Sequence, residues 1–124
     1  AKQLRAAVGV DGRHELRACD LFVEVKNVTM GAEPNVAAFP DSVSKRAAKH
    51  MTELAAQVAE GHRAVVFFLV SRGDALTMRP AEEIDPTYAR ALRAAVDSGV
   101  EVLAYRAEVS ANDITVGERV QVTL

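Results

Sequence analysis

Residues 63–70, Arg-Ala-Val-Val-Phe-Phe-Leu-Val, limit the possible folds of this chain more than any other segment. A continuous apolar run of this length is typical of a strand that is buried on both faces. Helical patterns precede it at residues 42–60 and follow it at residues 86–98, and another strand-like segment begins at Val100. Helices that connect strands in this order carry the chain back across the sheet. We therefore expect an α/β protein with a mixed, partly parallel sheet and helices on its faces.

Both helical segments have recognisable ends. Asp41 or Ser42 can cap the first helix and Gly61 ends it, while Asp85, followed by proline, caps the second and Gly99 closes it. We expect the first helix to bury one apolar stripe, because its apolar residues recur at spacings of three and four. The residues of this stripe are Val43, Ala47, Met51, Leu54, Ala55 and Val58.

The composition fits one globular domain. The chain has 124 residues, of which 49% are hydrophobic, which is enough for a substantial core. Cys19 is the single cysteine, so no internal disulfide bond can form, and a reducing compartment such as the cytoplasm is the simpler expectation. No apolar run approaches the roughly 20 residues of a membrane span. The net charge of −2 provides no overall basic field, so a nucleic-acid site would have to be a local patch.

Residues 21–30 form a second predicted strand, and this strand carries two charged residues. Glu24 and Lys26 are two positions apart, so their side chains project from the same face, together with Phe22. Charges on an apolar strand cost desolvation free energy unless they pair with each other or bind something else. An ordinary ion pair is the simpler interpretation of this spacing alone.

The start of the chain allows two strand registers. In one, Asp11-Gly12 is a hairpin turn and residues 13–29 form a nearly continuous strand. In the other, Cys19-Asp20 is the turn, and Glu15 then lies directly opposite Glu24. Opposed carboxylates about 5 Å apart repel unless a cation lies between them. The second register would therefore indicate a metal site.

A carboxylate pair beside a lysine suits a metal-dependent phosphodiesterase. Carboxylates bind Mg²⁺, and the metal polarises a phosphoryl oxygen and acidifies a bound water. The lysine can orient that water or stabilise the developing charge. Residues 42–60 follow with four basic side chains near the helix start, where a bound anion would favour them. These are Lys45, Arg46, Lys49 and His50.

Several motifs occur in a fixed order between about residues 21 and 110. They are Phe22-Val-Glu-Val-Lys-Asn-Val-Thr-Met30, Phe39-Pro-Asp41 with Arg46, Lys49-His50 and Glu53-Leu54, Ile84-Asp-Pro with Tyr88, and Gly99-Val-Glu-Val-Leu-Ala-Tyr105. Together they resemble the sugar fermentation stimulation protein A (SfsA) family. The resemblance covers the family's C-terminal domain, and the family's N-terminal OB-like domain has no counterpart in residues 1–124. It implies a restriction-endonuclease-like PD-(D/E)XK fold, DNA binding, and a suspected Mg²⁺-dependent nuclease activity. The family name also implies a regulatory role in sugar metabolism.

The resemblance also implies roles for individual residues. Glu24 and Lys26 match the fold's Glu-x-Lys pair and would be catalytic, with Glu24 also a metal ligand. The second motif implies that four residues near the first helix bind phosphate or nucleic acid, and these are Asp41, Arg46, Lys49 and His50. Ala47 stands where the family usually has glycine.

The first metal ligand has two possible counterparts. The family has an aspartate in a small-Arg-apolar-Asp-apolar motif upstream of the Glu-x-Lys strand. Residues 12–16 can supply this motif with Glu15 as the metal ligand, although closer to Glu24 than usual. Residues 4–8 are the alternative, and there the acid is missing.

Three functions are compatible with the sequence, and we rank DNA binding first, with nuclease activity as its expected mechanism. The chain can be a metal-dependent nuclease, a DNA-binding module without catalysis, or a protein-interaction domain in which Glu24 and Lys26 simply pair. The basic helix start favours the first two, and the net negative charge favours the third.

Overall fold

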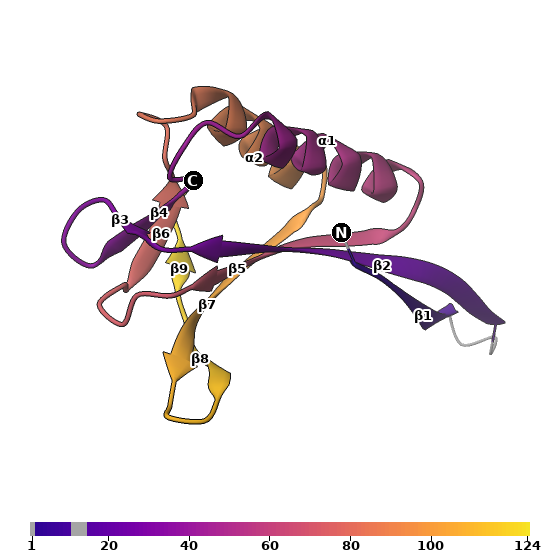
Figure 1. The fold of residues 1–124 in the computed structure, drawn as a ribbon. Coiled ribbons are helices and arrows are strands. Elements are labelled where there is room, and N and C mark those ends of the chain that lie inside the picture. The colour runs from indigo at the N-terminus through magenta and orange to yellow at the C-terminus, as the bar shows by residue number, and fades with distance from the viewer. Residues whose placement is uncertain (1, 11–14) are drawn as a thin grey trace.

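The computed structural model describes residues 2–10 and 15–124, and the side chains of residues 20–124. Helices and strands alternate over most of this length (Figure 1). The elements are β1 (Lys2–Val10), β2 (Glu15–Val28), β3 (Met30–Gly31), β4 (Val36–Phe39), α1 (Lys45–Ala59), β5 (Arg63–Val70), β6 (Thr77–Pro80), α2 (Pro86–Asp97), β7 (Glu101–Val109), β8 (Ile114–Arg119) and β9 (Gln121–Val122).

The main sheet confirms the predicted mixed α/β architecture. Its strand order is β1-β2-β5-β7-β8, with β2, β5 and β7 parallel and β1 and β8 antiparallel to their neighbours. Helices α1 and α2 lie together over one face of this sheet (Figure 1). The other face carries no helix of the described chain, and Val25 on that face is 55% exposed.

A second, four-stranded sheet was not predicted. Its order is β3-β4-β6-β9, and its strands contain only two to four residues each. Gly31, Pro34 and Asn35 predict a loop over residues 31–38, and the polar ends of residues 72–79 predict a connection between elements. Strands this short contain too few side chains to show an alternating pattern, so their pairing depends on contacts that are distant in sequence.

The core lies between the main sheet and the two helices. Every second residue of β5, starting from Ala64, has at most 1% of its surface exposed. Met51 and Leu54 of α1 and Leu92 of α2 pack onto this layer and are equally buried. The helical stripe was therefore largely predicted, although Val43 lies outside the helix and is 67% exposed.

Helix α1 begins later than expected. Its N-cap is Ser44, whose Oγ accepts a hydrogen bond from the Ala47 amide at 3.1 Å. The predicted caps Asp41 and Ser42 are exposed residues that precede the helix. The end was predicted well, because Gly61 follows the helix with φ of +92°, a conformation that glycine adopts without strain.

Asp85 connects the first turns of the two helices. As predicted, it caps α2, and its Oδ1 accepts from the Tyr88 amide at 3.0 Å. Its Oδ2 accepts from the Ser44 amide at 2.9 Å. The residue is only 3% exposed, so one buried carboxylate serves the N-termini of both helices.

The pairing of β1 with β2 decides between the two registers at the start of the chain. Strand β2 runs without interruption through Cys19-Asp20, and Cys19 pairs with Ala6. The register with a turn at Cys19-Asp20 is therefore wrong. The predicted Asp11-Gly12 turn falls within residues 11–14, which are outside the described part of the chain.

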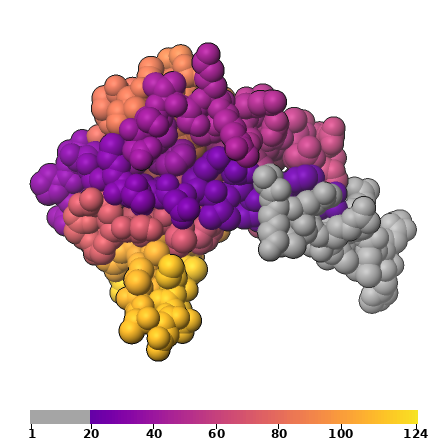
Figure 2. Space-filling view, viewed as in Figure 1, coloured from indigo at the N-terminus to yellow at the C-terminus, as the bar shows by residue number. Residues whose placement is uncertain are grey.

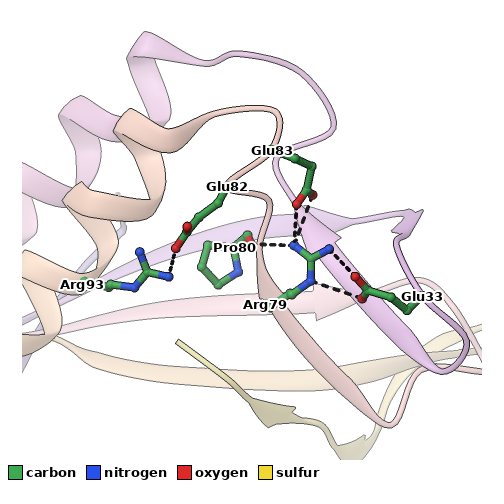
Figure 3. Close-up of polar contacts among 6 residues, drawn as sticks. All are labelled: Glu33, Arg79, Pro80, Glu82, Glu83 and Arg93. Atoms are coloured by element: carbon green, nitrogen blue, oxygen red, sulfur yellow. Dashed lines mark hydrogen bonds and ion pairs between the residues drawn. The ribbon is translucent and has the colours of Figure 1, made fainter.

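Arg79 ties three segments together at the edge of the second sheet (Figure 3). Its guanidinium contacts Glu33 of the β3–β4 loop at 2.7 Å and Glu83, which precedes α2, at 3.0 Å. The hydrogen bonds that Arg79 donates to these two carboxylates raise its pKa, so it stays charged. The cluster fixes the loops that lead into α2.

The β7–β8 hairpin stands away from the body of the protein (Figure 2). Three large apolar side chains on it, Val109, Ile114 and Val116, are at least 60% exposed. No helix within residues 2–10 and 15–124 is long and apolar enough to cross a membrane.

Candidate active site

The candidate site starts on β2, in the middle of the main sheet. Alternation of side chains along the strand turns Glu24 and Lys26 toward α1 and away from the open face. Their Nζ and Oε1 atoms are 3.1 Å apart, and the two side chains are 13% and 10% exposed, for Lys26 and Glu24 respectively. The predicted shared face and the predicted ion pair are both present.

His50 of α1 closes a triangle with these two residues. Its Nδ1 lies 2.9 Å from Lys26 Nζ and 3.1 Å from Glu24 Oε1, and its side chain is 17% exposed. With Lys26 charged, the ammonium donates to an unprotonated Nδ1, and the ring proton is then on Nε2. When the ring is protonated, Nδ1 instead donates to Glu24. The triangle thus has two arrangements of its protons.

The triangle keeps Glu24 ionised. Burial favours the neutral acid, but hydrogen bonding and positive charge, including those of Lys26 and His50, lower the pKa of Glu24 below its ordinary value. An ionised carboxylate beside an ammonium can accept a proton, bind a cation or orient a water molecule.

A small pocket adjoins the triangle between β2 and α1. Its volume is about 200 Å³, and it combines apolar with polar walls. Its lining consists of Phe22, Glu24, His50, Glu53, Leu54 and Gln57.

The basic residues of α1 lie around this site in two groups. His50 and Arg46 are one helical turn apart, so both lie on the side of α1 that faces the triangle. Lys45 and Lys49 are exposed on the adjoining surface, and Lys49 makes a loose contact with Glu53 at 3.9 Å. Exposed Arg46 and Lys45 have no ion pair within residues 20–124 and can bind an anion. Asp41 is exposed before the helix and has no hydrogen bond or ion pair in the same part of the chain.

Glu15 does not complete a metal site beside Glu24. The two residues are nine positions apart in the same strand, which separates their backbones by about 30 Å. Among the side chains of residues 20–124, no group of three or more His, Cys, Asp and Glu residues is placed to hold a metal ion.

Tyr88 and Asp85 were not predicted as parts of the site. Tyr88 is fully buried beneath it, with its ring 5.3 Å from that of Phe39. Its hydroxyl has no hydrogen-bond partner among the described residues. Burial, with the negative charges of Glu24 and Asp85, raises the pKa of Tyr88. The signal in the sequence was the Asp-Pro-x-Tyr segment, which predicted a helix start and contributed to the family resemblance but assigned no role in the site to either residue.

Comparison with known proteins identifies the family. The sequence profile described as "Sugar fermentation stimulation protein RE domain" matches residues 8–113 of the chain. The chain belongs to this family. A sugar fermentation stimulation protein homolog of Pelobacter propionicus is 55% identical over 103 residues, covering 83% of this chain and 44% of that protein. The homolog of Pseudomonas aeruginosa is 50% identical over 115 residues, covering 92% of this chain and 49% of that protein.

A solved structure supports the same conclusion for the fold of this SfsA-family domain. The structure of Pyrococcus furiosus SfsA in complex with Ca²⁺ matches it with a TM-score of 0.78 and 25% sequence identity. The match covers 89% of this chain and 49% of that one. The fold is restriction-endonuclease-like. The chain spans about half the length of the relatives it matches.

Proposed function

We propose that this SfsA-family domain binds the phosphodiester backbone of DNA and cleaves it with the help of a divalent cation such as Mg²⁺. The observation that carries this proposal is the Glu24–Lys26 pair. A carboxylate and an ammonium lie 3.1 Å apart on the central part of a restriction-endonuclease-like sheet, at the edge of a pocket.

In this proposal, each residue of the site has a separate role in binding or cleavage. Glu24 would hold the metal ion, and Lys26 would orient the attacking water and stabilise charge on the phosphoryl oxygens. Arg46 and the lysines of the first two turns of α1 hold neighbouring phosphates. His50 accepts a hydrogen bond from Lys26 and so fixes the position of its ammonium.

The protein groups at this site suit Mg²⁺ only if the substrate contributes further ligands. Mg²⁺ is usually bound by one or two carboxylates, with phosphate oxygens and water in the remaining positions. Glu24 supplies one such carboxylate. The Ca²⁺ named with the Pyrococcus furiosus relative supports a hard divalent cation, since Ca²⁺ also prefers oxygen ligands. When bound, the ion would acidify a water molecule and neutralise phosphoryl charge.

The decisive experiment is a cleavage assay on labelled DNA with Mg²⁺ and with chelator. We expect Glu24→Gln and Lys26→Met to abolish Mg²⁺-dependent cleavage, and Glu60→Gln, a change of an exposed carboxylate at the end of α1, to leave it intact. Of these three variants, only Glu24→Gln should lose the binding of Mn²⁺, as measured by calorimetry. Full activity in Glu24→Gln would refute the catalytic assignment.

Binding without cleavage is the second candidate. It is favoured because Glu24 already pairs with Lys26 and His50, and because residues 20–124 contain no cluster of three metal-binding side chains. This function predicts an affinity for DNA that falls steeply with salt, no metal-dependent cleavage, and a smaller salt dependence in Arg46→Ala.

A further inference from the structure

The pocket beside Glu24 has features that phosphate binding does not explain. A phosphodiester needs positive charge, yet the pocket is lined by two carboxylates, an amide and two apolar side chains in addition to His50. Phe22 and Leu54 form its apolar walls. Glu53 and Gln57 lie on the same side of α1 as His50, since the three residues are spaced by three, four and seven positions.

The aromatic wall of the pocket is held in a fixed orientation. The Phe22 ring packs against the imidazole of His62 with centroids 5.7 Å apart and an angle of 61° between the rings. His62 is itself held, because its Nδ1 accepts a hydrogen bond from the Asp20 amide at 3.1 Å. A preorganised aromatic face loses little conformational entropy when a second ring stacks on it.

The polar side of the pocket offers both donors and acceptors. Glu53 accepts hydrogen bonds, and the Gln57 amide both donates and accepts. The Nδ1 atom of His50 lies 2.9 Å from Lys26 Nζ, so Nε2 is the remaining polar atom of that ring. This mixture complements the edge of a nucleobase, which presents N–H and carbonyl or ring nitrogen groups side by side.

The size of the pocket suits a ligand with a single ring system. Its volume of about 200 Å³ is below the range of pockets that bury drug-sized ligands, which begins near 300 Å³. Glu24 lines the pocket and also belongs to the triangle, so a base held there would place its own phosphodiester next to Lys26.

We propose that this pocket holds one unstacked nucleobase, so that the domain acts on single-stranded nucleic acid or on a duplex with an extruded base. The inference rests on the proposed binding of phosphodiesters at the same site. Phe22 is the stacking wall, and Glu53 and Gln57 bind the edge of the base. Base stacking on an aromatic side chain contributes about 1–3 kcal/mol per base, which corresponds to an affinity gain of about 5-fold or more.

The test compares a short oligothymidylate with its abasic analogue of equal length and charge. Affinities are measured by fluorescence anisotropy with chelator present, so that no cleavage alters the probe. We expect the wild-type domain to bind the oligothymidylate about 5-fold or more tightly than the abasic oligomer. Phe22→Leu and Gln57→Leu should both bring this ratio close to one, while the affinity for the abasic oligomer stays the same.

Two further variants distinguish the base pocket from the proposed binding of phosphodiesters. Arg46→Ala should weaken binding of both oligomers equally, because it removes a phosphate contact. Glu60→Gln, outside the pocket on the same helix, should change neither affinity. Equal binding of both oligomers by the wild type, or an unchanged ratio in Gln57→Leu, would overturn the base pocket alone. Failure to bind either oligomer or a duplex would overturn the proposed nucleic-acid function and the pocket with it.

Discussion

Replacing Asp85 with alanine should weaken both helices at once. The carboxylate accepts from Tyr88 N at 3.0 Å and from Ser44 N at 2.9 Å, and it is only 3% exposed. Loss of the cap on α2 costs about 1 kcal/mol, and leaving the Ser44 amide without its partner costs about 1–3 kcal/mol. We therefore expect the free energy of unfolding to fall by about 3 kcal/mol, or the Tm to fall by about 12 °C for a domain of this size.

Urea denaturation followed by circular dichroism measures this loss, and two variants resolve its parts. Asp85→Asn keeps one carbonyl oxygen and so retains one of the two hydrogen bonds, which predicts a loss of about 1.5 kcal/mol. Ser44→Ala removes only the hydroxyl that accepts from Ala47 and leaves the backbone bond to Asp85, which predicts about 1 kcal/mol.

The relative losses of unfolding free energy in these variants test whether one carboxylate caps both helices. If one carboxylate serves two helices, Asp85→Ala must cost more than either Asp85→Asn or Ser44→Ala. A loss below about 1 kcal/mol in Asp85→Ala would refute the shared cap, since it would lie below that of an ordinary N-cap. Equal losses in Asp85→Ala and Asp85→Asn would instead attribute the effect to charge alone.

Three other changes have defined outcomes. Met51→Ala, at a core position with 0% exposure, should lower the free energy of unfolding by about 2–5 kcal/mol in urea denaturation. The pKa of Glu24 is lower in the folded state than its ordinary value near 4.3. The stability that its ionised form contributes is therefore complete above the ordinary value. It is lost as the pH falls through the folded-state pKa. Unfolding measured across this range should therefore depend less on pH in Glu24→Gln than in the wild type. Arg79→Lys breaks the bidentate contacts with Glu33 and Glu83, and the resulting fall in Tm should shrink in high salt.

The main sheet and its helices were predictable because their signals are local. The apolar run of β5 and the helical stripe around Met51 need only their own residues to be recognised. Asp85 with the proline after it marks a helix start in the same way. The α1 start was placed too early because Asp41, Ser42 and Ser44 are all acceptable caps, and only the contact of Ser44 with Asp85 decides among them.

The site was only partly predictable, because only part of it depends on signals that are local in the sequence. Alternation along one strand was enough to place Glu24 beside Lys26. His50 comes from another element, and the sequence suggested a phosphate-binding residue on the basic helix, whereas the structure turns it inward against Lys26. Glu15 shows the limit of strand arguments, because the position of one turn decides whether its backbone lies opposite Glu24 or about 30 Å away along the same strand.

The parallel pairing of β2 with β5 also has a kinetic consequence. Glu24 pairs with Val66, so the two strands meet across more than 40 residues of chain, and α1 with His50 lies in the loop that this pairing closes. Contacts this distant in sequence form slowly, since the chain entropy of the loop is lost before packing compensates for it. We therefore expect the Glu24–Lys26–His50 triangle to form late in folding, together with the closure of the sheet.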